Sequence, residues 1–376
     1  MSFGGRIFNI TFLPITFYKT NYHKKMKKII PLFIFLLSSF CVLAQPEDPK
    51  ALHETAKAFM KSGDFNNAII VLNRALQQDS KNLEIQKDLA MTYYLKRDYQ
   101  KALESVKVLI DRGDADVVTF QIAGNIYKAL EEVKECEKLY KKALKKFPKS
   151  GPLYSEYGEL LLSAKDYSAI KQWEEGIKVD PAYSGNYYNA ALFYSQTKDK
   201  VWSLIYGEIF VNMESFGERG AAMKQLLLQG YKEKLFANGD LTKEAEENKS
   251  EFAKSFLQGM TKQSPLANKG ITTETLTMIR TRFILDWYAN NATKLPFRLF
   301  DYQRQLLSEG MFNAYNQWLF GPLENLAAYE NWTKTNTEEY NGFNTFQKSR
   351  VFRMPPGQYY QGSKSGNNNS GKPAFF

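Results

Sequence analysis

The chain has 376 residues, of which 50 are Lys or Arg, 40 are Asp or Glu and only two are His. Six of the basic residues and none of the acidic ones lie in residues 1–44, so the net charge falls from +10 for the whole chain to +4 beyond that stretch. Such a nearly balanced charge does not favour nucleic acid as a partner. One histidine is left beyond residue 44, which excludes a metal site built on two histidines.

Residues 26–44 have the pattern of a secretory signal peptide. Lys27 and Lys28 form a basic start, an apolar run follows, and Val42 and Ala44 precede the expected cleavage after Ala44. The apolar run is shorter than the ~20 residues that a membrane-spanning helix needs, although a retained anchor is the alternative. We therefore expect an exported protein, periplasmic or associated with the outer membrane of a Gram-negative bacterium.

Residues 1–25 fit no targeting pattern, and Met26 makes the better start, so we expect a non-native upstream extension here. Lipidation at Cys41 is disfavoured, because Phe40 stands where an acylated cysteine is preceded by a small residue. The remaining cysteine, Cys136, is expected to be buried. A single cysteine cannot form a disulfide within the exported chain.

From residue 49 onward the chain repeats itself with a period of 33 or 34 residues. An acidic residue marks each unit at Asp64, Asp98, Glu132, Asp166 and Asp199. Two columns of small residues keep the same period, at Ala56, Ala90, Gly124, Gly158 and Ala191 and at Ala68, Ala102, Cys136, Ala169 and Ser203. Small residues on facing turns let two antiparallel helices approach closely. A fixed period of this length is typical of a solenoid.

These columns resemble the tetratricopeptide repeat (TPR), with a small residue in the eighth place, an aromatic in the eleventh and Ala in the twentieth. The resemblance implies a helix-turn-helix solenoid. It covers residues 49–217 as five units, 49–82, 83–116, 117–150, 151–183 and 184–217. In the fifth unit Lys200 replaces the turn aromatic and Phe210 a small residue, so its second helix is expected to pack atypically.

The resemblance also implies that a ligand would lie along the concave face, which the first helix of each unit forms. The residues at the matching places are His53, Lys57, Lys61, Lys87, Met91, Tyr94, Gln121, Asn125, Lys128, Ser155, Glu159, Leu162, Tyr188, Leu192 and Ser195. The early half of this face is expected to be basic and the later half polar to apolar, which suits an extended peptide or a partner helix. The two-carboxylate clamp of chaperone-binding relatives is not supported, because Asp88, Val118 and Ile122 occupy its places.

No catalytic, cofactor-binding or metal-binding residue is predicted. The sequence has no G-x-x-x-x-G-K-[ST] phosphate loop and no G-x-S-x-G elbow, and His53 would be the only histidine available to a triad. We therefore expect no cofactor and no enzymatic activity in the repeats.

Residues 218–340 do not continue the repeat columns but are expected to form a helical C-terminal domain. Apolar residues follow helical spacing in three stripes, from Leu276 to Tyr288, from Tyr302 to Leu319, and from Leu323 to Trp332. Their aromatic residues predict a buried helical core. The alternative is an aromatic groove for a glycan or peptide, or an enzyme, positioned by the repeats.

Residues 341–376 contain no Asp or Glu but several basic residues, among them Lys348, Arg350 and Arg353. Because part of this segment is also of low complexity, the sequence predicts a disordered basic tail that could touch an anionic surface.

Taken together, the sequence predicts an all-α fold, a TPR-type helix-turn-helix solenoid followed by a helical C-terminal domain. The expected function is that of an exported scaffold or adaptor, whose partner is another protein or a peptide and not nucleic acid. The favoured binding residues are Lys57, Lys61, Lys87, Tyr94, Asn125 and Lys128. Self-association through the repeats is a further alternative.

Overall fold

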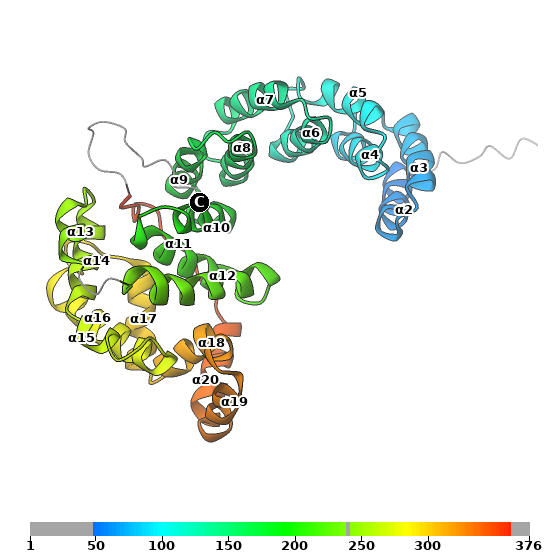
Figure 1. The fold of residues 1–376 in the computed structure, drawn as a ribbon. Helices are drawn as coiled ribbons and strands as arrows, with labels where there is room; N and C mark the ends of the chain where they lie inside the picture. Colours follow the sequence, from blue (N-terminus) through cyan, green and yellow to red (C-terminus); the bar gives the residue numbers. More distant parts are fainter. Residues whose placement is uncertain (1–47, 238–240, 362–376) are drawn as a thin grey trace, which may run out of the picture.

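The computed structural model describes residues 48–237 and 241–361. Within them every regular element is a helix, and an arc of paired helices continues into a second helical bundle (Figure 1). The predicted all-α solenoid is thus confirmed. The predicted extension 1–25, the signal peptide 26–44 and residues 362–376 of the predicted tail lie outside the described residues. Of the described helices, none is both long and apolar enough to cross a bilayer.

The arc consists of five antiparallel helix pairs. In Figure 1 the first helices of the pairs line the inner, concave side, and the second helices of the first four pairs line the outer side. In chain order the helices are α2 (Pro49–Ser62), α3 (Phe65–Gln78), α4 (Leu83–Leu95), α5 (Tyr99–Leu109), α6 (Val117–Ala129), α7 (Val133–Lys146), α8 (Gly151–Ser163), α9 (Ala169–Val179), α10 (Ser184–Ser195) and α11 (Lys200–Met213).

The turns within the pairs repeat as regularly as the sequence does. One residue with positive φ ends the first helix of each of the first four units, at Gly63, Arg97, Glu131 and Lys165. The acidic marker follows directly, and Asp64 and Asp98 each accept a hydrogen bond from the first turn of the next helix. These side chains satisfy amide groups that would otherwise have no partner at a helix start. The recurring acid is therefore a capping side chain at Asp64, Asp98 and Asp199, whereas Glu132 makes no such hydrogen bond and Asp166 lies two residues before the N-cap Ser168.

The small-residue columns lie where the paired helices touch. A Cβ atom at Gly124 would stand 2.2 Å from the Tyr140 hydroxyl oxygen, so no side chain fits between α6 and α7. Cys136 is fully buried beside it, as predicted. Burial raises the pKa of its thiol to about 11, which keeps the group protonated and unreactive at neutral pH.

Beyond the arc the chain forms a helical bundle packed on α11. Its elements are α12 (Glu218–Gln229), the π-helix η1 (Gly230–Leu235), α13 (Thr242–Glu247), α14 (Glu251–Thr261), α15 (Ser264–Ala267), α16 (Thr273–Asn290), α17 (Arg298–Ser308), α18 (Phe312–Glu324), α19 (Leu326–Thr335) and α20 (Thr337–Lys348). The second helix of the fifth unit packs atypically, as predicted, because α11 is buried on almost every side between α10 and this bundle. One continuous core of buried residues runs from Ala90 to Met354.

Three predictions about this half are wrong. The apolar stripe from Leu323 to Trp332 is not one buried helix, because Asn325 separates α18 from α19 and no residue of α19 is buried. The apolar stripe from Tyr302 to Leu319 is not one helix, because Gly310 adopts a φ of 70° and separates α17 from α18. Nor is the segment from residue 341 to residue 361 a disordered tail. It completes α20 and then packs on the bundle, with Phe352 and Met354 buried and Tyr360 stacked on Phe252 at 5.1 Å between ring centroids.

Candidate functional site on the concave face

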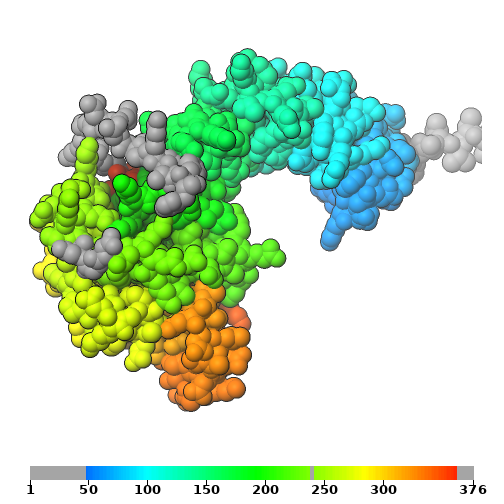
Figure 2. Space-filling view, in the orientation of Figure 1, coloured from blue at the N-terminus to red at the C-terminus, as the bar shows by residue number. Residues whose placement is uncertain are grey.

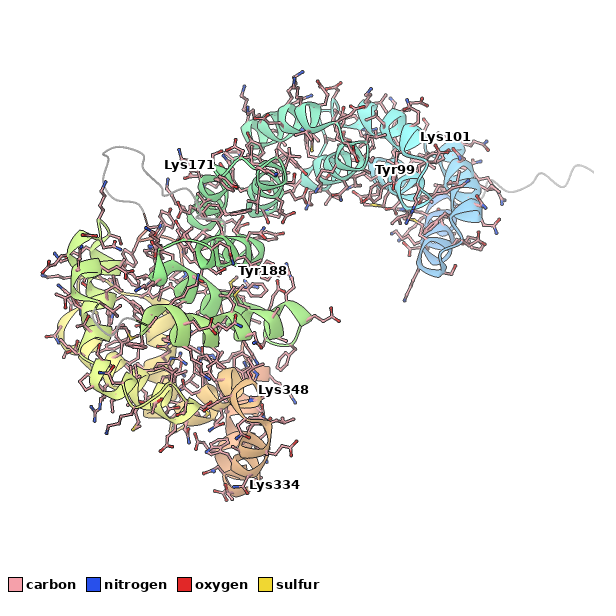
Figure 3. The ribbon with its side chains drawn as sticks, in the orientation of Figure 1. Tyr99, Lys101, Lys171, Tyr188, Lys334 and Lys348 are labelled. Carbon is pink, nitrogen blue, oxygen red and sulfur yellow. The ribbon has the colours of Figure 1, made fainter. Side chains whose placement is uncertain are left out.

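The inner helices present the predicted site residues on one side of the arc. Most of these residues occupy the fifth, ninth and twelfth places of a unit, spaced by four and three, and Lys61 occupies the thirteenth, so they share one helix face. Figure 3 shows Tyr188, in the fifth place of its unit, on the inner side of α10, whereas Lys101 and Lys171 lie on the outer side. In the space-filling view the hollow of the arc is open to solvent (Figure 2).

The side chains in the fifth place of three units, His53, Gln121 and Ser155, are not free to contact a ligand, because they form hydrogen bonds with the next repeat. His53 Nε2 lies 2.7 Å from Asp88 Oδ2, and Gln121 Nε2 donates to Glu156 Oε1 at 2.6 Å. Each bond connects the fifth place of one unit to the sixth place of the next. Asn189 donates to Ser155 Oγ at 3.1 Å in the same register. These residues form a polar ladder that fixes the curvature of the arc.

Lys87 is the clearest departure from the predicted basic groove. Its side chain is buried, and its ammonium group lies 2.7 Å from both Asp116 and Glu84. Although burial by itself would lower the pKa of Lys87, its hydrogen bonds to the two carboxylates raise that pKa above the usual value for lysine. Lys87 therefore ties α4 to the start of α6 and is not available as a free cation.

The remaining predicted residues of the early half are accessible to different degrees. Lys57 is exposed but paired with Glu54 at 3.0 Å, while Met91 and Tyr94 are half-buried. The side chains of Lys61, Asn125 and Lys128 make no hydrogen bond or ion pair with any other described residue. These three side chains keep donors available on the inner face.

The later half of the face is more apolar. Leu162 and Leu192 are each 38 % exposed on the inner helices α8 and α10. Between them Glu159 accepts a hydrogen bond of 2.9 Å from Asn189. Tyr188 is half-buried beside them, and Ser195 is buried. The face therefore offers apolar side chains at one end and free donors at the other.

Arg219 contributes to this end of the face from outside the repeats. Its guanidinium carbon lies 5.1 Å from the Tyr188 ring centroid and 5.3 Å from that of Phe210. Glu214 holds it at 2.6 Å. Reasoning from the sequence missed Arg219, because the residue lies on α12, beyond the last repeat, and no periodic signal marks it.

The described part of the chain has no cluster of metal ligands. It contains no group of three or more His, Cys, Asp or Glu side chains that could hold a metal ion. The aromatic residues Phe252, Phe283, Trp287 and Phe300 are buried against one another rather than lining a groove. They form the predicted helical core of this half and offer no exposed platform for a glycan.

Comparisons with known proteins agree with the repeat architecture. Residues 59–118 match the family model of the tetratricopeptide repeat. None of the curated proteins matches the chain. Among solved structures the chain is similar to TTC0263, a thermophilic TPR protein of Thermus thermophilus, with 16% identity, a TM-score of 0.40 and coverage of 48% of this chain and 99% of that one.

Two further similar structures are MamA from Desulfovibrio magneticus and YrrB, described as a TPR protein with an unusual peptide-binding site. MamA has 12% identity, a TM-score of 0.37 and coverage of 45% of this chain and 96% of its own. YrrB has 16% identity, a TM-score of 0.35 and coverage of 50% and 97%. The family match, together with the helix pairs and their turns, identifies the repeats as tetratricopeptide repeats.

Proposed function

We propose that this chain is a non-enzymatic scaffold that holds a peptide segment or a helix of a partner protein along the concave face of its repeats. The observation that carries the proposal is the combination of exposed Leu162 and Leu192 with the unpaired donors of Lys61, Asn125 and Lys128 on one continuous face. Apolar anchors at one end of a face and free hydrogen-bond donors at the other can give an extended peptide both affinity and orientation. The polar ladder supports the same reading, because it keeps the face rigid before binding.

Site-specific photocrosslinking in cells tests the proposal. A photoreactive residue replaces Leu192 on the inner face in one protein and Val108 in a matched control. Val108 is equally apolar and 66 % exposed, but lies on the outer helix α5. We expect a discrete crosslinked partner from position 192 and none from position 108. Crosslinks from position 108 alone, or the same products from both, would count against a concave binding face.

We also propose that the protein is exported, on the strength of residues 27–44 alone. The short apolar run and the small residues before Gln45 support cleavage rather than anchoring. Mass spectrometry of the protein from cell fractions measures this directly. A new N-terminus at Gln45 outside the cytoplasm is expected, whereas an intact leader in the membrane fraction would instead show an anchor.

A further inference from the structure

Glu159 is an exposed carboxylate in the ninth place of the fourth repeat, on the inner helix α8. The other carboxylate of α8, that of Glu156, is fully used, because Gln121 donates to its Oε1 at 2.6 Å and Tyr140 to its Oε2 at 2.8 Å. Glu159 accepts hydrogen bonds on Oε1 only. Its Oε2 atom makes no hydrogen bond or ion pair with any other residue that the structure describes.

Two neighbouring side chains hold the Glu159 carboxylate in place. Asn189 of α10 donates to its Oε1 at 2.9 Å, and Ser155 donates to the same oxygen at 3.3 Å. Ser155 is 2 % exposed, and Asn189 also donates to its hydroxyl at 3.1 Å. A side chain that is oriented before binding loses less conformational entropy when a partner arrives. The Oε2 atom is therefore a positioned acceptor that the chain itself does not use.

Exposed apolar side chains surround this carboxylate. Leu162 follows Glu159 by three residues on α8, and Leu192 occupies the same ninth place on α10. Tyr188 lies half-buried one turn before Leu192. When a partner covers such apolar side chains it also excludes water, and an ion pair with less water around it is stronger. A cation bound to Glu159 would therefore contribute more than one bound to an acid on an outer helix.

The basic residues of the inner face do not compensate Glu159. Helix α8 contains two Glu and no Lys or Arg, and α10 contains no charged residue. Arg219 is held by Glu214 at 2.6 Å, and Lys128 makes no ion pair within the described part of the chain. At the opposite end of the arc, α2 carries three Lys and one Glu. The inner face is thus acidic at α8 and basic at α2.

We infer that the partner segment carries a Lys or Arg between apolar residues, and that this cation binds Glu159 while an apolar side chain covers Leu162 and Leu192. The inference rests on the proposed function, because it names the chemistry of the segment that the concave face holds. Since Oε1 already accepts two hydrogen bonds, the cation donates one charge-assisted hydrogen bond to Oε2 rather than forming a bidentate pair. Charge complementarity also orients the segment, with its basic residue at α8 and any acidic residues toward α2.

Selection from a phage-displayed library of random 12-residue peptides against the full chain tests this inference. Binding on the concave face is recognised by its loss in Leu192→Asp, and we expect the peptides bound there to carry a Lys or Arg flanked by apolar residues. One such peptide is then synthesised, and its affinity is measured by calorimetry. Glu159→Gln should weaken its binding about fivefold or more, because the charge is lost. The amide oxygen of the new side chain still accepts from Ser155 and Asn189, so the fold is retained.

Glu104→Gln is the matched control, because Glu104 is exposed on the outer helix α5 and makes no ion pair with a described residue. It should change the affinity by less than about twofold. Replacing the basic residue of the peptide with Gln completes a double-mutant cycle. That peptide should bind wild type about as weakly as the original peptide binds Glu159→Gln, and the two changes together should have little further effect.

The outcomes separate this inference from the proposed function. Peptides that bind the concave face without a basic residue, or that keep their affinity for Glu159→Gln, overturn the inference and leave the proposed function standing. If no peptide is enriched, or if every enriched peptide binds Leu192→Asp as tightly as wild type, the proposed function fails and this inference fails with it.

Discussion

Gly158 lies where α8 passes over Trp173 of α9, and the space there admits no side chain. A Cβ atom at this position would stand 2.2 Å from Trp173 Nε1, the atom that donates a 3.1 Å hydrogen bond to the carbonyl of Ser155. Trp173 is itself buried and cannot move outward without opening the core. The small residue in the eighth place of this unit is therefore a packing requirement.

Gly158→Ala should lower the free energy of unfolding by about 2–3 kcal/mol, because the added methyl group displaces Trp173. Gly342→Ala is the matched control, since Gly342 lies in helix α20 and a Cβ atom there meets nothing within 4 Å. That change should stabilise the protein by about 0.5–1 kcal/mol through helix propensity. Urea denaturation measures both. Equal effects of the two substitutions would show that the packing at Gly158 is not the cause.

Glu174 on α9 makes stability depend on pH. Burial raises the pKa of its carboxyl group to about 7, despite hydrogen bonds from Tyr194, Tyr359 and Gln361. Below pH ~4.5 the group is protonated in both the folded and the unfolded chain, and its contribution to stability is complete. Between pH ~4.5 and 7 only the unfolded chain ionises, so stability is lost as the pH rises.

Glu174→Gln should therefore match wild type in stability near pH 5 and exceed it near pH 8, by up to about 3 kcal/mol. Burial raises the pKa of the nearby Asp199 to about 6, but this residue is present in both proteins, so its effect cancels in the difference. Urea denaturation at several pH values gives the result. A difference that stays constant from pH 5 to pH 8 would contradict the assignment to Glu174.

At the scale of elements, a buried polar network attaches α11 to the C-terminal helices. Arg280 of α16 donates to Glu208 of α11, and Gln303 and Tyr315 donate to the same carboxylate oxygen at 2.6 Å and 2.7 Å. Arg280 also donates to Asn316 at 2.5 Å. Arg280 and Glu208 are 2 % and 4 % exposed, so each compensates a charge that would otherwise be costly to bury.

Glu208→Leu should destabilise the protein by about 3–5 kcal/mol, because it leaves the Arg280 charge buried without a partner. The double change Glu208→Leu with Arg280→Met should recover part of that loss, since it removes the unpaired Arg280 charge but leaves Gln303 and Tyr315 without their acceptor. Lys57→Ala is a control, as it breaks an exposed pair and should cost less than about 1 kcal/mol. Additive effects of Glu208→Leu and Arg280→Met would show that the two charges are not coupled.

The elements of the repeats could be predicted from sequence because each unit carries its own turn, cap and small residues. Asp64 and Asp98 mark helix starts, and the structure shows both as N-caps. The break at Gly310 left a signal that was not used, because the apolar spacing steps by six residues from Leu306 to Phe312, where a helix steps by three or four. The sequence contains a signal for the buried network that was not used. Glu208 is the only charged residue in the apolar run Val201–Val211.

The candidate site was less predictable than the fold. The sequence placed His53 and Lys87 on the inner helices, but their burial depends on Asp88 of α4 and on Asp116 at the start of α6, each from the next inner helix along the chain. A signal for the ladder exists in retrospect, since complementary polar residues recur 35 residues apart at His53 and Asp88 and at Gln121 and Glu156. Composition also led to the wrong prediction that Arg350 lies in a disordered tail.

At the scale of the whole molecule, the repeats and the bundle form one continuous body. Trp202 of α11 stacks on Phe252 of α14 at 5.6 Å, and the buried network crosses the same interface. A fragment ending near residue 217 would expose this apolar surface. Binding therefore has to be measured on the full chain, where the open hollow of the arc remains the surface available to a partner (Figure 2).

The most direct test of the account is the affinity of the full chain for the partner segment captured at position 192, measured by calorimetry for Leu192→Asp and Val108→Asp. Both substitutions place a charge on an exposed apolar position, one on the concave face and one on the outer helix α5. The account predicts about tenfold or greater weakening for Leu192→Asp and less than about twofold for Val108→Asp. Unchanged affinity in Leu192→Asp, or equal loss in both, would contradict binding on the concave face.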